Sequence, residues 1–321
     1  MPIPKHIYCF RYETYEEALC KLESKYIFEE ENANKVLFTD VKVEPSSSAF
    51  IKTRLDIIKS SNDYPTLIKE IKSEEIHLDG FKVEYVVFDG DTTEYPERLE
   101  KLKDIGFSID GTPNYYKPTV TYALCIHEGI WYFGTLIKNH YAWEKHNKKP
   151  FSYSNSISIN IAKSLVNIAA KGNYENSLID TCCGVGTILL EAAFAGYNIE
   201  GFDINWKVCR NARGNLAHFG FETTVYRADI KDIDKRYDAA IIDLPYNLLS
   251  CASEDDVVHI ITSAGELSDR LVIVSIADIA SVIENAGFQI TDQCSVGKRG
   301  KTSFERKVWV CERGVIENTE Q

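Results

Sequence analysis

The sequence lacks the features of membrane and secreted proteins. No run of about 18 apolar residues occurs anywhere in its 321 residues, and its first residues have no cationic start followed by an apolar core. The nine cysteines form no Cys-x-x-Cys pair, and only Cys182 and Cys183 are adjacent, which argues against a disulfide framework or a zinc site. The seven histidines show no metal-ligand spacing either. We therefore expect a soluble, cytoplasmic protein with reduced thiols and no bound metal.

An excess of positive charge is also missing. The formal net charge is −12, which argues against extensive binding to nucleic acid of any sequence, since such binding depends on Lys and Arg neutralising phosphates. Two local basic runs remain, within residues 117–149 and 298–307, and each is either a solvated surface or a ligand site. The first run contains Lys117, Lys138, Lys145, Lys148 and Lys149, and the second contains Lys298, Arg299 and Lys301.

The second half of the chain has the pattern of an α/β protein. From about residue 177, short apolar strands alternate with amphipathic helices, which we predict at 186–196, 206–219, 254–268 and 278–286. This order is typical of a doubly wound parallel sheet. Two alternating runs near the end, "QITDQCSVG" and "SFERKVWVCER", predict a closing antiparallel hairpin. A further helix is predicted at 156–171, where Ile157, Ile161, Leu165 and Ile168 form one apolar face.

The first half is less regular and predicts a smaller α+β region. Strands are predicted at 7–10, 81–90, 119–129 and 130–139. Helices are predicted at 14–26, 49–61, 64–73 and 96–109. Small mixed folds of ferredoxin-like type have a similar order of elements. With 321 residues, the chain is long enough for this region and the α/β region each to bury a core.

The turn after the first strand of the α/β region carries the clearest chemical signal. The stretch "LIDTCCGVGTILLE", residues 178–191, places Asp180 ahead of Gly184 and Gly186. Glycines there permit a tight turn and let the backbone approach a ligand closely. A dinucleotide fingerprint requires a third glycine where Leu189 stands, and an acid before the glycines would repel a diphosphate. The pattern favours a ligand with a cationic amino group, such as the methionine part of S-adenosylmethionine.

Acids also end the next two predicted strands. Asp203 in "GFDIN" lies 23 residues after Asp180 and is suited to accept hydrogen bonds from both hydroxyls of a ribose. Asp229 in "RADIKD" follows the third strand and can accept a hydrogen bond from the amine of adenine. Any one of these acids alone can be a helix cap. Three of them at successive strand ends, together with the two glycines, indicate one ligand-binding crevice.

The fourth strand ends in "AAIIDLPYN", residues 239–247, at the carboxyl edge of the same sheet. An exocyclic amine on a base is a poor nucleophile, because its lone pair is delocalised into the ring. If Asp243 and the backbone carbonyl of Leu244 each accept an N–H bond, the lone pair can point at a sulfonium methyl group. Pro245 fixes the turn and Tyr246 offers a face for stacking. The stretch therefore predicts a catalytic loop that works mainly by proximity and orientation.

These motifs resemble a known family. "DTCCGVGT" with Glu191, "GFDIN" and "DLPY" are similar to the class I S-adenosylmethionine-dependent methyltransferases that modify exocyclic amines, and more narrowly to the tRNA guanine-N2 methyltransferases acting on guanosine 10. The resemblance covers about 150–312. In that family the catalytic loop reads Asp-Pro-Pro-Tyr-Gly, so Leu244 replaces its first proline and Asn247 its glycine. Leucine keeps a backbone carbonyl that can accept the amine.

The resemblance implies a domain order, a cofactor and a set of site residues. It implies a small α+β domain at 1–48, a THUMP-like RNA-binding domain at 49–148 and a Rossmann-like, seven-stranded methyltransferase domain at 149–321. Its cofactor would be S-adenosylmethionine and its partner RNA, most specifically tRNA. The residues that would bind the RNA are the basic residues of the two runs, Lys117, Lys138, Lys145, Lys148, Lys149, Lys298, Arg299 and Lys301. The predicted catalytic residues are Asp243, Leu244, Pro245 and Tyr246. The predicted donor-binding residues are Asp180, Cys182, Gly184, Gly186, Thr187, Asp203, Ile204, Asp229 and Ile230, with Phe151 and Tyr153 assigned either to the donor pocket or to core packing.

Several alternatives stay open beside the leading hypothesis of a tRNA guanine-N2 methyltransferase. The amine can belong to an rRNA guanine, a DNA adenine or a protein glutamine, because it looks much the same to a carboxylate in each. A base in a duplex would also have to be flipped out, which costs about a few kcal/mol. A non-catalytic RNA-binding module would keep the fold without the reaction. A nicotinamide dehydrogenase would bind a dinucleotide instead.

Overall fold

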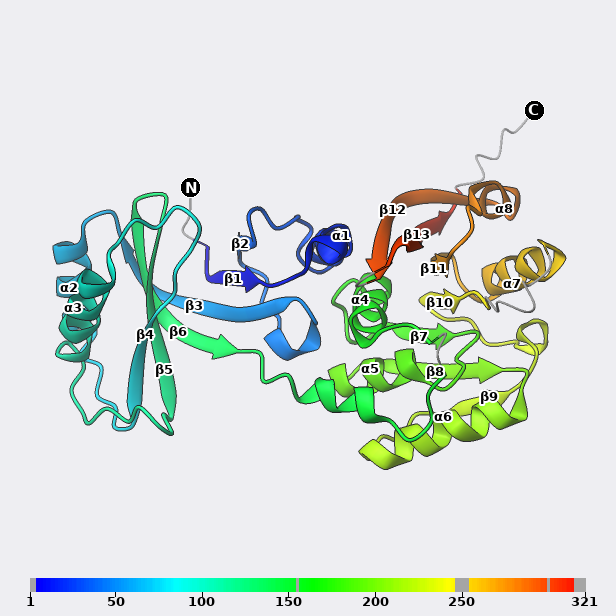
Figure 1. Ribbon diagram of the computed structural model, residues 1–321, viewed down its shortest axis with the longest axis horizontal. Coiled ribbons are helices and arrows are strands. Elements are labelled where there is room, and N and C mark those ends of the chain that lie inside the picture. Colours follow the sequence, from blue (N-terminus) through cyan, green and yellow to red (C-terminus); the bar gives the residue numbers. More distant parts are fainter. Residues whose placement is uncertain (1–3, 154–155, 246–253, 299–300, 315–321) are drawn as a thin grey trace. The chain divides into compact units, whose positions relative to one another are not determined.

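The computed structural model describes residues 4–153, 156–245, 254–298 and 301–314, and the chain divides into two compact units (Figure 1). The first unit comprises Met1–Arg11, Asn32–Pro45 and Ile51–His140. The second comprises Tyr12–Glu31, Ser46–Phe50 and Tyr141–Gln321. The N-terminal segment thus contributes to both units. The division into three domains at residues 48 and 148 stays a prediction.

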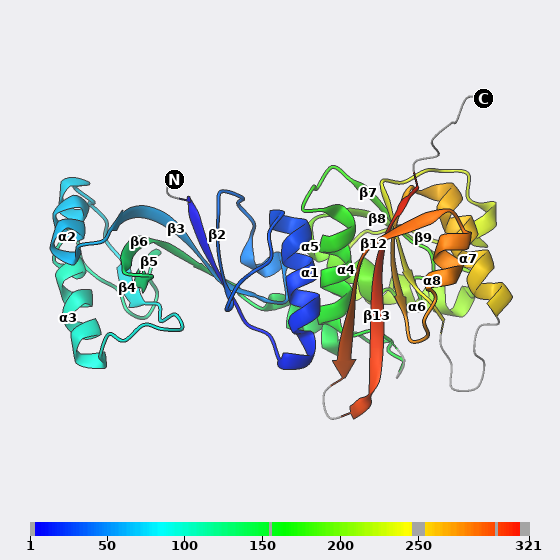
Figure 2. The ribbon, with the colours of Figure 1, turned by 90° about the horizontal axis from the view of Figure 1, so that it is seen from above.

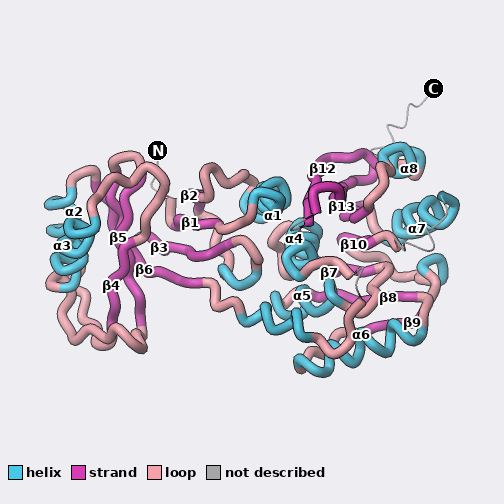
Figure 3. The backbone as a smooth tube through the Cα atoms, viewed as in Figure 1, coloured by secondary structure: helices cyan, strands magenta, loops and turns pink. Residues whose placement is uncertain are grey.

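The first unit is built on a six-stranded sheet in the order β2-β1-β3-β6-β5-β4. Its strands are β1 His6–Phe10, β2 Val36–Thr39, β3 Ile51–Ser61, β4 Phe81–Tyr85, β5 Val120–His127 and β6 Ile130–Lys138. Neighbouring strands are antiparallel except for the parallel pair β4 and β5. Helices α2 Tyr64–Ser73 and α3 Tyr95–Gly106 lie side by side against β4, β5 and β6 (Figure 3). Leu67 and Ile105 of these helices pack with Leu124 and Phe133 of the sheet.

The predicted helix at 49–61 is wrong, because the structure forms strand β3 there. Ile51, Leu55 and Ile58 lie at spacings of four and three, which suit a helix. The apolar residues of the same segment also occur at alternate positions, as in a strand. In the structure, β3 pairs with β1 on one side and with β6 on the other. Strand partners on both sides favour the extended conformation. These partners are distant in sequence, so the segment alone does not predict them. The short strand β2 was also missed.

Gly134 of β6 tests this packing. Its substitution by alanine is expected to destabilise the first unit by about 1–3 kcal/mol, as at other overpacked sites, because the added Cβ would lie 2.0 Å from the carbonyl oxygen of Asp56 on β3. The control is Gly106→Ala at the end of α3, where a Cβ meets nothing within 4 Å. Hydrogen exchange of the β3 and β6 amides measures the effect. Equal protection in the two variants would contradict the close approach of the strands.

The second unit contains a seven-stranded sheet in the order β12-β13-β11-β10-β7-β8-β9. Its strands are β7 Ser177–Asp180, β8 Asn198–Asp203, β9 Val225–Arg227, β10 Ala239–Asp243, β11 Arg270–Ser275, β12 Phe288–Lys298 and β13 Lys301–Arg313. The five strands β7 to β11 are parallel, and β12 and β13 form an antiparallel hairpin beside β11. The predicted doubly wound sheet with a closing hairpin is confirmed.

Helices cover both faces of this sheet. Helices α4 Ile159–Ala170, α5 Thr187–Ala195 and α6 Trp206–Phe219 pack on one face, and α7 Glu254–Leu267 and α8 Ala280–Asn285 pack on the other. The N-terminal helix α1 Glu17–Phe28 packs against α4 and the edge strand β12 (Figure 2). Short 3-10 helices occur at Thr14–Glu16, Pro45–Ser47, Ala142–Lys148 and Ile230–Asp232. Among the described residues, no helix has the length and hydropathy to cross a bilayer.

Candidate active site

The turn between β7 and α5 is held by its glycines and by one aspartate. Gly184 and Gly186 have φ angles of +53° and +78°, in the left-handed region that favours glycine. Asp203 at the end of β8 accepts hydrogen bonds from the amides of Gly184 at 3.1 Å and Asn205 at 2.8 Å. The carboxylate of Asp203 therefore fixes the turn from the neighbouring strand. Each of its oxygens still has lone-pair capacity for a ligand.

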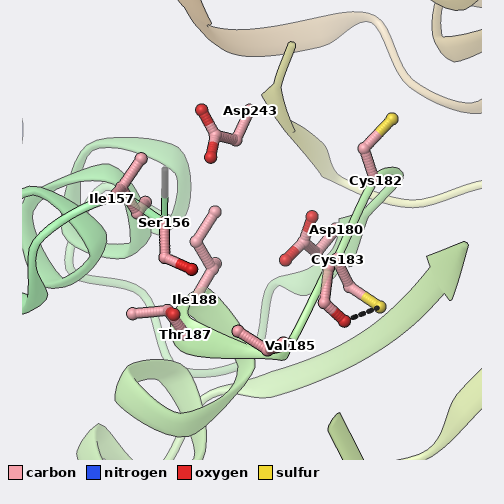
Figure 4. Close-up of a pocket in the computed structure, with 10 residues that line it drawn as sticks. Ser156, Ile157, Asp180, Cys182, Cys183, Val185, Thr187, Ile188 and Asp243 are labelled. Carbon is pink, nitrogen blue, oxygen red and sulfur yellow. Dashed lines mark hydrogen bonds between the residues drawn. The ribbon is translucent and has the colours of Figure 1, made fainter. Parts of the chain in front are cut away.

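The turn and the end of β10 enclose one cavity of about 50 Å³ (Figure 4). Asp180 is in register with Ile241 of β10, so that Asp243, two residues further, projects from the same face of the sheet. The carboxylates of Asp180 and Asp243 both face the cavity (Figure 4). Its lining residues are Ser156, Ile157, Asp180, Cys182, Cys183, Gly184, Val185, Thr187, Ile188 and Asp243.

The two buried carboxylates of this cavity have few hydrogen bonds to offset their loss of hydration. Neither oxygen of Asp180, nor Oδ1 of Asp243, has a hydrogen bond of good geometry within the described part of the chain, although the backbone N–H of Cys182 is close enough to Asp180 to favour its ionised form. Burial, reinforced by the charge of Asp243, raises the pKa of Asp180 well above its usual range. Burial also raises the pKa of Asp243 to about 7, with Arg306 opposing the rise. Such a pair suits a cationic ligand, which would favour the ionised form of both groups.

Five of the predicted site residues line the cavity, namely Asp180, Cys182, Gly184, Thr187 and Asp243. The other predicted donor residues lie outside its lining. Ile204 is 70% exposed next to Asp203, whereas Ile230 is buried in the core under α7. Asp229 caps the 3-10 helix at Ile230–Asp232 and lies 3.4 Å from Nε2 of His259. Leu244 is buried and Pro245 exposed, while Tyr246 lies outside the described residues.

The segment before α4 reaches the cavity through different residues from those predicted. The ring of Phe151 packs on Gly214 of α6, and both its backbone groups bond to the amide side chain of Asn215. The hydroxyl of Tyr153 accepts a hydrogen bond from Asn211. Instead, Ser156 and Ile157 line the cavity. No signal in the sequence distinguishes Ser156, and Ile157 was predicted only as part of an apolar helix face.

The predicted RNA-binding lysines divide between the two units. Lys117 and Lys138 belong to the first unit and are exposed, and Nζ of Lys138 lies 2.6 Å from Glu84. Lys145 and Lys148 are exposed in the second unit. Burial lowers the pKa of Lys149, with Glu191 opposing. The side chains of Lys298 and Lys301, and all of Arg299, lie outside the described residues.

Glu191, part of the glycine-turn motif, lies in the core of the second unit and does not line the cavity. Its Oε1 is 2.7 Å from Nδ1 of His146, and its Oε2 is 3.5 Å from Nζ of Lys163. All three side chains are buried. Because burial disfavours the charged form, the pKa of Lys163 is lowered, while the charge of Glu191 opposes that effect. This cluster joins α5, α4 and the segment Ala142–Lys148.

A protein-family model matches part of the second unit. Residues 146–260 match the family model described as an RMKL-like methyltransferase domain. Together with the strand order and the glycine turn, this match confirms the class of domain predicted from the sequence, a Rossmann-like methyltransferase domain.

Individual relatives are similar over different lengths. The chain is 32% identical over 137 residues, 42% of its length, to the tRNA (guanine(10)-N2)-dimethyltransferase of Methanothermobacter thermautotrophicus. It is 22% identical over 68% of its length to the enzyme of the same name from Methanocaldococcus jannaschii. The matches span 37% and 65% of those two relatives. The crystal structure of TrmN from Thermus thermophilus has a TM-score of 0.48 and 15% identity, covering 96% of this chain and 99% of that one.

The raised pKa of Asp243 predicts a pH-dependent effect on stability. Because the native state holds this proton more tightly than the unfolded state does, the free energy of unfolding falls as pH rises from about 4 to about 7. The substitution Asp243→Asn removes this loss of unfolding free energy. The Tm of the variant is therefore expected to exceed that of the wild type at pH 8 and to equal it at pH 4. The gain in Tm should be about 2–4 °C for each kcal/mol of unfolding free energy recovered.

Asp238, near the opposite end of β10, is the matched control. Hydrogen bonds from the Ser177 side chain and backbone lower its pKa, so Asp238→Asn is expected to give no gain at pH 8. Thermal unfolding at both pH values measures the two variants. Equal unfolding curves of Asp243→Asn and the wild type at both pH values would contradict the claim that the pKa of Asp243 is raised by burial.

Proposed function

We propose that this protein transfers a methyl group from S-adenosylmethionine to the exocyclic amine of an RNA base, with N2 of a guanosine in tRNA as the substrate. The observation that carries the proposal is the cavity shared by Asp180 and Asp243 at the carboxyl edge of a parallel sheet. The two relatives named as tRNA (guanine(10)-N2)-dimethyltransferases support the choice of base and RNA. The net charge of −12 disfavours a DNA substrate held by an extended basic groove.

The residues of the cavity fit the methionine end of the donor. The two buried carboxylate oxygens of Asp180, which have no hydrogen bond of good geometry among the described residues, suit a group that is cationic and donates N–H bonds. A cavity of about 50 Å³ is far smaller than the roughly 300–1,000 Å³ of typical ligand pockets, so it would take only one end of the donor. Asp203 and the exposed Ile204 stand at the next strand end and would serve the adenosine part.

The protein would act mainly by orienting the amine. The amine nitrogen would bond to the methyl carbon of the donor as the carbon–sulfur bond breaks, so that the sulfur leaves as a neutral thioether without acid catalysis. The methylated amine would then lose one proton to water. Asp243 would accept one N–H of the amine through its free oxygen Oδ1, and this requires the carboxylate to be ionised. The carbonyl of Leu244 would accept the other N–H, turning the lone pair toward the methyl group. The exposed lysines Lys145 and Lys148 of the same unit would contact the RNA backbone.

Methylation of unmodified tRNA, followed by mass spectrometry of its nucleosides, tests the proposal. We expect N2-methylated guanosine from the wild-type protein. Asp243→Ala is expected to lower kcat by about 100-fold or more, because the amine loses its orientation. Asp238→Asn, at the other end of the same strand, is expected to retain activity.

The outcomes separate the alternatives. A product on adenine, or methylation of rRNA, DNA or a protein glutamine instead of tRNA, would replace the proposed substrate but keep the reaction. Binding of RNA without any binding of S-adenosylmethionine in calorimetry would point to a non-catalytic module and overturn the proposal. Stabilisation by a nicotinamide dinucleotide alone would do the same.

A further inference from the structure

The closing hairpin carries a buried arginine. Arg306 of β13 is only 7% exposed, although it belongs to the basic run 298–307 that resembles a solvated surface in the sequence. A guanidinium stays charged in proteins, and arginines are rarely buried unless they are paired. The position of Arg306 therefore requires an explanation in terms of the groups around it.

The strand register brings Arg306 to the face and edge of the sheet that hold the cavity. Asp243 is in register with Val274 of β11, which is in register with Val308 of β13. Residues in register project from the same face, and so do residues two apart on one strand. Arg306 therefore projects from the same face as Asp243. Because β13 runs antiparallel to β11, Arg306 lies just past the pair Lys307 and Ser275, at the carboxyl edge of the parallel strands.

The neighbouring Lys307 shows the opposite arrangement. It projects from the other face, where Trp309 packs in the core beneath α7 and α8, and its Nζ lies 2.6 Å from Asp278. Arg306 and Lys307 thus project from opposite faces of the sheet. Of these two residues, only Arg306 is directed to the face that carries the two carboxylates.

The groups that face Asp243 come from several elements of the second unit. Strand β7 contributes the carboxylate of Asp180, and the turn after it contributes the thiols of Cys182 and Cys183. The segment before α4 and the start of α5 contribute the uncharged residues Ser156, Ile157, Thr187 and Ile188. Among the described residues, Arg306 is the cationic side chain with an electrostatic influence on Asp243.

We propose that Arg306 is a positioning residue that keeps Asp243 ionised, so that the carboxylate can accept the N–H groups of the substrate amine. This inference rests on the proposed function and adds one residue to its machinery. A nearby cation is needed because two carboxylates in one buried cavity oppose each other's ionisation. The cationic donor would neutralise the end of the cavity near Asp180, and Arg306 serves the end near Asp243.

The test compares Arg306→Gln and Arg306→Lys with Lys307→Gln as the matched control. Two quantities are measured between pH 5.5 and pH 9, the affinity for S-adenosylmethionine by calorimetry and kcat/KM for tRNA methylation. In Arg306→Gln, we expect the pH at which each quantity reaches half its maximum to rise by about one unit. Arg306→Lys keeps the charge and should restore the wild-type midpoint. Lys307→Gln should leave both profiles in place.

The outcomes also separate this inference from the proposed function. If the wild type binds no S-adenosylmethionine at any pH, the proposed function fails. If the wild type binds the donor and methylates RNA but Arg306→Gln lowers both quantities equally at every pH, Arg306 is only structural and the inference is overturned. Should Arg306→Gln not fold, Arg306→Lys and the similarly long Arg306→Met replace it, and equal midpoints in these two variants would overturn the inference.

Discussion

The site depends on two carboxylates that the parallel sheet forces into one cavity. Asp180 and Asp243 end neighbouring strands, and their register turns both side chains to the same face. Burial disfavours the ionised form of both groups, and the charge of Asp243 disfavours that of Asp180 further, so the pKa of each group is raised. A ligand that brings positive charge would offset this cost. The surrounding features, from the glycine turn to the buried arginine on the hairpin, can be understood as devices that hold these two groups in place.

The neighbouring strand stabilises the turn and leaves the cavity open. Asp203 uses its carboxylate to bind the amide of Gly184, so the backbone at the turn keeps the left-handed conformation that brings it close to a ligand. Had this acid faced the cavity as well, a third carboxylate would have joined the two already there. Its place one strand away instead lets the same side chain support the turn and present further lone pairs at the sheet edge. Structural and binding roles are therefore compatible in one residue.

The sequence predicts most of the second unit because its strands are short apolar runs separated by clear helices. The proximity of Asp180 and Asp243 follows from a general rule, since the carboxyl ends of parallel strands share one edge. The positions of Arg306 and Ser156 do not follow from any such rule. A buried arginine inside a basic run looks like a surface residue until the register of the hairpin is known. The segment 49–61 has apolar residues at both helical and alternating spacing, and only its strand partners β1 and β6 resolve the ambiguity.

The second unit also depends on a helix that is distant from it in sequence. Helix α1 packs on α4, and Glu23 of α1 accepts hydrogen bonds from Ser164 and Asn167 of α4. Burial raises the pKa of Glu23 to about 7, while these hydrogen bonds oppose the rise. Because the residues just before α4 line the cavity, the support that α1 gives to α4 extends to the site. A fragment that begins at residue 149 would lose this helix and leave the polar side chains of α4 without their partner. The second unit is therefore defined by packing rather than by a single point in the chain.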